Sequence, residues 1–428
     1  MDEQPACNVI EMRCVMLSET LCSLAASTMR IGRCKSLFEV LLFFAAGIVL
    51  AGSIAGCASP AVIMQDFCAS ESLLADAHFE GGNLGACIVS DQGVFELTLH
   101  PENDPPINVA PWYAFRLSGK PGQQAVVQMQ FEHGYARYWP KISHDGENWA
   151  RLNEEQVLIS DDGTHMEIRL VLDQARVWVA GQEITASAYY DDWIRDLSTH
   201  EDIATRLAGN SVQGRPIYMA ETADRKEMIL LLGRQHPPEV AGALAMRPFV
   251  DTLLSDTELA RQFRERFKLV VFPLLNPDGV VAGYWRHNVN GTDLNRDWGL
   301  FTQPETQLVR DWMSDAGNNG IQIRLMLDFH ATKRNIFYTQ RDVDEKMLAG
   351  FTRHWLMSAA ERLPEYEFER DAEEPSDQAN SKNYFHMTYG IPAITYELGD
   401  ETRRDLIESS AIVFAEEMMR AMLQVRPD

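Results

Sequence analysis

The chain has 428 residues, of which 46% are hydrophobic, and a formal net charge of −24 at pH 7. This length and apolar content are sufficient for two or three domains with buried cores, and they exclude a disordered or collagen-like chain. The negative charge argues against nucleic acid as a partner, because a polyanion would be repelled from such a surface.

The first 57 residues have the layout of an export signal. Arg30, Arg33 and Lys35 precede an apolar run at 40–57 that ends in IAGC, which is the order of regions in a secretory signal. IAGC resembles the bacterial lipoprotein cleavage box, so we expect Cys57 to be lipidated and to anchor the protein to a membrane. An uncleaved membrane helix is the alternative, because the run approaches the length of a span. Either way, we expect the bulk of the chain in the cell envelope, facing the periplasm or the exterior.

Residues 1–28 fit this signal poorly, so Met29 is an alternative start, in which case 1–28 would not be translated. Signal removal and acylation of Cys57 would leave only Cys68 and Cys87 as thiols. In an oxidising compartment these two cysteines form either one disulfide or a pair of free buried thiols.

Short strands separated by turn residues follow, up to about residue 190. Their apolar residues alternate with period two, which predicts a β-sandwich domain over 58–190. The runs read GACIVS, GVFELTLH, WYAFRLSG, QAVVQMQF, HMEIRLVL and ARVWVA.

After Trp193 the pattern changes to helices that alternate with strongly apolar strands. The strands EMILLLG, FKLVVFPLL, IRLMLDF and AITYELG alternate with helical runs such as VAGALAMRPFVDTLL. This alternation predicts an α/β domain over 191–428, with a mixed, mostly parallel sheet buried between layers of helices. The domain boundary is expected within 187–199.

Histidine and glutamate residues occur at the ends of three of these strands. His236 and Glu239 follow MILLLG, His330 follows IRLMLDF, and Glu397 closes AITYE. Sites in open α/β sheets collect at the carboxyl ends of strands, and two histidines with one carboxylate leave the fourth position of a catalytic Zn²⁺ open. The alternatives are a Pro-Pro turn with solvated side chains at 236–239 and a hydrogen-bonded core histidine at 330.

The segment 276–298, NPDGVVAGYWRHNVNGTDLNRDW, is a loop rich in fixed polar groups. Loops of this kind commonly bind ligands. Arg286 can stabilise a developing oxyanion, and Asn295 with Arg296 can hold a carboxylate through forked hydrogen bonds. A plain turn at NPDG and solvated arginines are the alternatives.

These motifs resemble those of a known family. HPPE, NPDG, WR, DLNRDW, DFH and ITYE occur in the order and approximate spacing of the zinc carboxypeptidases. Upstream, HFEGGNLG, PWYAFRL and SHDGENW resemble the N-terminal domain of the cytosolic carboxypeptidase subgroup. The similarity extends over roughly residues 67–422, and six ordered motifs are far more specific than a single HxxE.

The resemblance implies one Zn²⁺ per catalytic domain and a role for each matching residue. These are His236, Glu239 and His330 as metal ligands; Asp293 as the carboxylate that orients His236; Glu397 as general base and acid; Arg286 as the group that polarises the scissile carbonyl; and Asn295 and Arg296 as the pair that binds the terminal carboxylate.

The sequence departs from the family at one position. Pro375 occupies the neighbourhood in which the family carries a substrate-binding tyrosine, and Tyr384 either replaces that tyrosine or belongs to the core. Lys382 lies near the position that sets the preference for the departing residue. A lysine there favours an acidic C-terminal residue, and a solvated lysine is the alternative.

Together these features predict a lipid-anchored zinc metallocarboxypeptidase. We expect it to remove one residue from a peptide with a free C-terminal carboxylate, by means of zinc-activated water. Two alternatives remain: a zinc amidase or carboxypeptidase acting on murein peptides of the envelope, and a non-catalytic peptide-binding lipoprotein.

Overall fold

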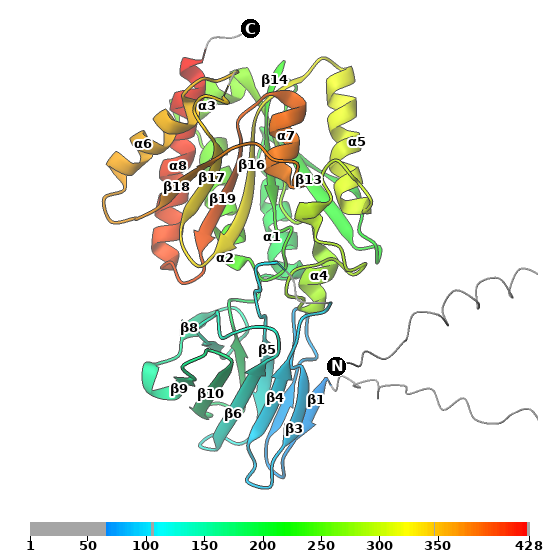
Figure 1. Ribbon diagram of the computed structural model, residues 1–428, viewed down its shortest axis with the longest axis vertical. Coiled ribbons are helices and arrows are strands. Elements are labelled where there is room, and N and C mark those ends of the chain that lie inside the picture. Colours follow the sequence, from blue (N-terminus) through cyan, green and yellow to red (C-terminus); the bar gives the residue numbers. More distant parts are fainter. Residues whose placement is uncertain (1–65, 104–106, 346, 426–428) are drawn as a thin grey trace, which may run out of the picture. The chain divides into compact units, whose positions relative to one another are not determined.

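The computed structural model describes residues 66–103, 107–345 and 347–425 (Figure 1). The expected export signal, the alternative start at Met29 and the expected lipidation site at Cys57 lie outside these residues. Among the residues that are described, no helix combines the length and apolar character needed to cross a membrane.

Two β-sheets form the N-terminal part. The first has the strand order β1-β2-β5-β11-β7-β8 and the second β3-β4-β6-β10-β9. The bounds are β1 Phe67–Ala69, β2 Leu74–Asp76, β3 Ala86–Val89, β4 Phe95–Leu99, β5 Ala114–Ser118, β6 Gln124–Phe131, β7 Lys141–Ser143, β8 Trp149–Arg151, β9 Val157–Ile159, β10 His165–Val171 and β11 Arg176–Ala180. Neighbouring strands are antiparallel, except for the parallel pair β4 and β6.

Period-two alternation places the apolar side chains of this part in one core. In β6, Ala125, Val127, Met129 and Phe131 are buried, and the residues between them are more exposed. They join buried residues of both sheets in a single hydrophobic cluster, because only one face of each sheet is covered by the other. The predicted β-sandwich is confirmed.

Cys68 and Cys87 form a disulfide across the sandwich. Cys68 lies on β1 of the first sheet and Cys87 on β3 of the second, and their Cα atoms are 6.0 Å apart. Of the two alternatives for these cysteines, the structure has the bridge. Closing a loop of this size restricts the unfolded chain and stabilises the fold by about 3 kcal/mol.

The C-terminal part is built on an eight-stranded sheet of order β12-β13-β15-β14-β16-β19-β17-β18. The bounds are β12 Ile203–Asn210, β13 Pro216–Thr222, β14 Glu227–Gly233, β15 Phe267–Phe272, β16 Gln322–Thr332, β17 Ile336–Gln340, β18 Glu369–Glu373 and β19 Ala393–Gly399. The central strands β15, β14, β16 and β19 are parallel, whereas β12, β13 and β17 pair with their neighbours toward the centre in antiparallel fashion. The sheet is therefore mixed and mostly parallel, as predicted.

Helices cover both faces of this sheet (Figure 1). Their bounds are α1 Ser187–Ser198, α2 Val240–Leu254, α3 Glu258–Arg266, α4 Pro277–Ala282, α5 Pro304–Asn318, α6 Phe351–Arg362, α7 Ser381–Tyr389 and α8 Arg404–Gln424. Every residue of β14 is buried. Ile229 and Leu231 pack in a cluster with α2, α6 and α8, whereas Leu230 and Leu232 pack in a second cluster with α5 and α7. Burial on both faces explains why β14 is continuously apolar.

Candidate metal centre and its pocket

A tight turn carries the chain from β14 to the HPPE segment. Arg234 has a positive φ of 51°, an uncommon conformation for a residue with a side chain. Its buried guanidinium donates from Nε to the Pro237 carbonyl over 2.9 Å and from Nη1 to Thr185 Oγ1 over 2.5 Å. These bonds fix the turn. The side chains that follow it are buried, with His236 3% and Glu239 6% exposed. A turn with solvated side chains is therefore excluded.

Close packing of α2 against β16 brings Glu239 to His330. Glu239 is the N-cap residue of α2, and Gly242 lies in the first turn of that helix. A Cβ atom at Gly242 would lie 2.6 Å from the His330 carbonyl oxygen, so only glycine permits this approach of the two backbones.

Two imidazoles and one carboxylate meet at this point. His236 Nδ1 lies 2.8 Å from Glu239 Oε1, and His330 Nδ1 lies 2.7 Å from Glu239 Oε2. Each Nε2 atom contacts another carboxylate: that of His236 is 2.9 Å from Asp293 Oδ1, and that of His330 is 2.9 Å from Asp328 Oδ2. Such partners hold a metal-binding histidine in one tautomer and orientation, so both Nδ1 atoms face Glu239.

The donor set fits a divalent cation. One ligand atom from each of His236, Glu239 and His330 lies within 4.8 Å of the other two. Imidazole lone pairs that face a carboxylate need a proton or a metal ion between them. Although burial disfavours the charged imidazole, Asp328 and Glu239 raise the pKa of His330 well above its usual value. The site therefore attracts positive charge, and its mixed nitrogen and oxygen ligands suit Zn²⁺.

Glu397 lies next to this donor set. It is the register partner of His330 across the parallel strands β16 and β19, which places both residues at the carboxyl edge of the sheet. Its Oε2 atom is buried and has no hydrogen-bond partner. Burial, reinforced by the Glu239 carboxylate, raises the pKa of Glu397 to about 8.

The loop 283–298 brings four predicted residues to the same place. Arg286 Nε donates to Asp293 Oδ2 over 2.7 Å, so Asp293 bridges Arg286 and His236. Asn295 Nδ2 lies 3.4 Å from His330 Nε2, and Arg296 Nη1 donates to the Asn295 carbonyl over 2.7 Å. The structure thus brings together residues spread over more than a hundred positions, and their individual roles remain predictions.

A pocket of about 260 Å³ lies here, and His236, Glu239 and Glu397 are among the residues that line it. Its cationic lining residues are Arg137, Arg286, Arg296 and Lys382, and its carboxylates are Glu239, Glu373 and Glu397. Lys382 is 4% exposed and its Nζ atom bonds Glu373, which excludes a solvated lysine. The pocket is small and polar, and its lining carries charges of both signs.

Tyr384 is not brought to the pocket. Its ring lies 6.1 Å from that of Trp298 and 5.1 Å from that of Phe301, measured between centroids. Tyr384 therefore belongs to an aromatic cluster that packs α7 against residues 298–301. Tyr338 on β17 lines the pocket instead. Tyr338 could not be singled out from the sequence, because it lies within an ordinary strand pattern and outside all of the recognised motifs.

The sandwich also contributes to the pocket, which sequence reasoning missed. Arg137 lies between β6 and β7, and its side chain is 4% exposed. Its guanidinium donates to Asp400 Oδ2 over 2.8 Å and to the Ala331 carbonyl over 3.1 Å. Both acceptors lie one to three residues from His330 or Glu397, so Arg137 buttresses the ends of β16 and β19.

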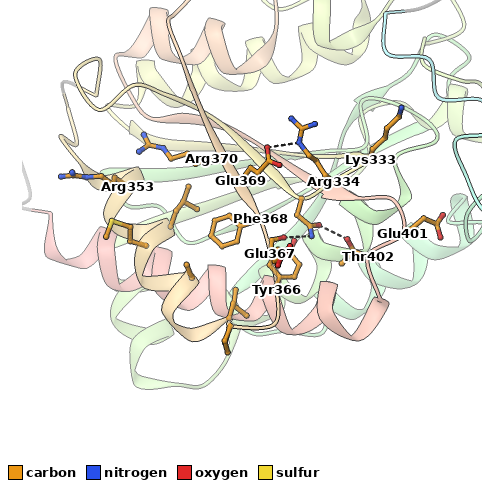
Figure 2. A pocket seen from close by; sticks show the side chains of 16 residues that line it. Lys333, Arg334, Arg353, Tyr366, Glu367, Phe368, Glu369, Arg370, Glu401 and Thr402 are labelled. Atoms are coloured by element: carbon orange, nitrogen blue, oxygen red, sulfur yellow. Dashed lines mark hydrogen bonds and ion pairs between the residues drawn. The ribbon is translucent and has the colours of Figure 1, made fainter.

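A larger cavity of about 960 Å³ lies between α6 and β18 (Figure 2). Figure 2 shows that its charged side chains include Arg334 and Glu369, which bond each other over 3.0 Å. The histidine and glutamate donors do not line this cavity. Volume alone does not locate the chemistry, and the smaller pocket is the candidate active site because two of the three donors, His236 and Glu239, line it together with Glu397.

Comparison with known proteins agrees with this geometry. The family model described as zinc carboxypeptidase matches residues 190–411, and the model described as the cytosolic carboxypeptidase N-terminal domain matches 75–181. Cytosolic carboxypeptidase 6 of Caenorhabditis elegans is 25% identical over 67% of this chain and 69% of its own length. An uncharacterized protein of Zymomonas mobilis is 23% identical over 78% of this chain and 90% of its own length.

Solved structures share the fold. A metallo-carboxypeptidase from Burkholderia cenocepacia has a TM-score of 0.68 at 19% identity, covering 82% of this chain and 99% of its own. One from Pseudomonas aeruginosa, in complex with (2-guanidinoethylmercapto)succinic acid, has a TM-score of 0.67 at 20% identity, covering 82% and 100%. The family model spans more than half of the chain and the donor set fits its metal, so this chain belongs to the zinc carboxypeptidase family and is a metallopeptidase with zinc as its cofactor.

Proposed function

We propose that this protein is a metallocarboxypeptidase that removes one residue from the C-terminus of a peptide, with Glu397 as general base and then general acid. The observation that carries the proposal is the buried, unpartnered Oε2 atom of Glu397 beside the donor set of His236, Glu239 and His330. When bound, zinc acts as a Lewis acid and lowers the pKa of a water molecule.

The surroundings of Glu397 suit a group that exchanges protons. A general base works best when its pKa lies near the working pH. Burial raises the pKa of Glu397 from the ordinary value of a glutamate to about 8. Its free Oε2 atom can accept a proton during attack and return it to the departing amine. Arg286, held by Asp293, presents a fixed cation to the oxyanion that develops on the scissile carbonyl.

The arginines that line the pocket support an exopeptidase. Asn295 and Arg296 line the pocket together with Arg286, and an arginine fork is suited to a carboxylate. A peptide that ends in a free carboxylate satisfies these groups, whereas an internal peptide bond leaves them unpaired.

Lys382 supports a preference for an acidic C-terminal side chain. Its ammonium is buried and bonds the Glu373 carboxylate, whose side chain is 45% exposed. A glutamate or aspartate of the substrate can take the place of Glu373 without leaving a buried charge unpaired, whereas an apolar side chain cannot.

The function is tested by incubating the zinc-loaded full chain with peptides that differ only in their last residue, and with the same peptides carrying a C-terminal amide. We expect release of single amino acids from the free acids and at least a 100-fold slower reaction for the amides, because a neutral amide lacks the carboxylate that Asn295 and Arg296 would bind. Equal cleavage of both forms, or internal cleavage, would contradict the proposal. Murein peptides in the same assay address the envelope alternative.

Lys382→Met is the test of side-chain preference. We expect kcat/KM for peptides ending in glutamate to fall by about 10-fold to 100-fold, the worth of one charge-assisted hydrogen bond, while peptides ending in leucine change little. Glu373→Gln is the matched variant: it frees the ammonium and should increase the preference for glutamate. If Lys382→Met slows all peptides equally, the lysine has no role in selectivity.

A further inference from the structure

The end of α4 and the start of the loop that carries Arg286 are docked on the sandwich. The Gly81 amide donates to the Val281 carbonyl over 2.8 Å, and Asn83 Nδ2 donates to the Gly283 carbonyl over 2.9 Å. The Trp285 side chain, which is 1% exposed, packs in the sandwich core. The backbone of this loop therefore takes its position from the sandwich.

Glu102 of the sandwich holds the residues on both sides of Arg286 and Arg286 itself. Its carboxylate accepts hydrogen bonds from the amides of Trp285 over 2.7 Å, Arg286 over 3.0 Å and His287 over 2.7 Å. Its Oε1 atom also lies 2.8 Å from His287 Nδ1. Only 5% of its side chain is exposed. Three successive amides that converge on one buried anion form a rigid clamp, because charge-assisted hydrogen bonds are strong in a desolvated place.

The Arg286 side chain points from this clamp toward the metal centre. Its Nε atom bonds Asp293 Oδ2 over 2.7 Å, and Asp293 Oδ1 contacts His236 Nε2 over 2.9 Å. Glu102 thus reaches a metal ligand through two intervening groups and touches none of the reacting atoms.

We propose that Glu102 is a positioning residue for catalysis: by holding the backbone at 285–287, it aims the Arg286 guanidinium at the carbonyl oxygen of the substrate. This inference rests on the proposed role of Arg286. Its consequence is that the sandwich is part of the active site and more than a border to it.

The expected signature of this role is a change in kcat. A donor aimed at a developing oxyanion acts mainly in the transition state, so moving it lowers kcat and leaves ground-state binding almost intact. A purely structural anchor would lower the melting temperature and the fraction of active protein, but it would leave the kcat of the folded fraction unchanged.

The test compares variants of the zinc-loaded full chain on one peptide substrate. In Glu102→Gln an amide NH₂ replaces one accepting oxygen and faces backbone donors, so we expect kcat to fall about 10-fold to 100-fold, with KM within about 2-fold and zinc content unchanged. Glu102→Asp keeps the anion and should recover part of kcat. If Glu102→Gln does not fold, the kcat of Glu102→Asp decides, because a folded aspartate variant at wild-type kcat overturns the proposal.

Asp76→Asn is the matched control. Asp76 is a buried sandwich carboxylate, with a side chain 3% exposed, that bonds Arg116 over 2.7 Å and does not contact the loop. We expect a similar loss of melting temperature and a normal kcat per folded molecule.

A double-mutant cycle isolates the coupling. In an Arg286→Ala background, Glu102→Gln should lower kcat no further, because the group that it positions is gone. Equal losses in both backgrounds, or wild-type kcat in Glu102→Gln, would overturn the inference. If the wild-type chain releases no amino acid from any peptide, it is the proposed function that fails, and this outcome is distinct.

Discussion

Glu397→Gln is expected to lower kcat by about 10³-fold while zinc remains bound at one ion per chain, since general-base catalysis typically contributes 10²-fold to 10⁴-fold. Glutamine keeps the shape of the side chain but cannot accept the proton that attack on the peptide bond releases. The donor set is untouched, because Glu397 contributes none of its three ligand atoms. The measurements are steady-state kinetics and zinc content by mass spectrometry.

Glu401→Gln is the control for this variant. Glu401 lies four positions further along the chain, is 40% exposed at its side chain and bonds Lys141 outside the pocket. We expect its kcat to stay within about 2-fold of wild type, as is usual for a surface carboxylate. Turnover by Glu397→Gln at more than a tenth of the wild-type rate would rule out Glu397 as the base.

The substitution Glu397→Gln also changes how the stability of the zinc-free protein depends on pH. The folded-state pKa of Glu397 lies at about 8, above the ordinary value of a glutamate, so the folded state resists ionisation. Wild-type stability therefore falls as pH rises from about 4.5 to 8, because the unfolded chain releases this proton more readily. Glutamine removes that loss, so the melting temperature of Glu397→Gln should exceed that of wild type increasingly across this range.

The donor set could be predicted because each of its residues lies at or just beyond the carboxyl end of a recognisable strand. The continuously apolar β14 and β16 mark buried parallel strands, whose carboxyl ends meet at one edge. His236, Glu239, His330 and Glu397 therefore converge as expected from local patterns and strand order.

The contribution of the sandwich could not be predicted in this way. Glu102 and Arg137 lie 184 and 263 positions from their partners Arg286 and Asp400. An isolated charged residue in a loop belongs to no periodic pattern, and such residues are usually exposed to solvent. Only the packing of the two parts shows that these charges are buried and paired. Lys382 and Tyr384 illustrate the same limit, since their environment depends on how α7 packs and not on its sequence.

Glu239→Gln should weaken zinc binding by at least about 100-fold, because losing a ligand costs more than the 10-fold to 100-fold typical of outer partners. The carboxylate is the only anion that faces the Nδ1 atoms of both His236 and His330 among the described residues. Glutamine offers one neutral oxygen, and its NH₂ group donates to one imidazole and so occupies the lone pair that the metal requires. Zinc titration by calorimetry measures the affinity, and peptide hydrolysis should fall in proportion.

Glu373→Gln separates loss of a ligand from loss of charge in the pocket. Glu373 lines the same pocket but is not one of the three donors, so the zinc affinity of Glu373→Gln should equal that of wild type.

A weakened site still obeys mass action, so excess zinc should restore part of the activity of Glu239→Gln, which a misfolded variant could not show. Wild-type zinc affinity in Glu239→Gln would mean that the two imidazoles bind the metal without this carboxylate. The donor set would then have to include another residue of the pocket.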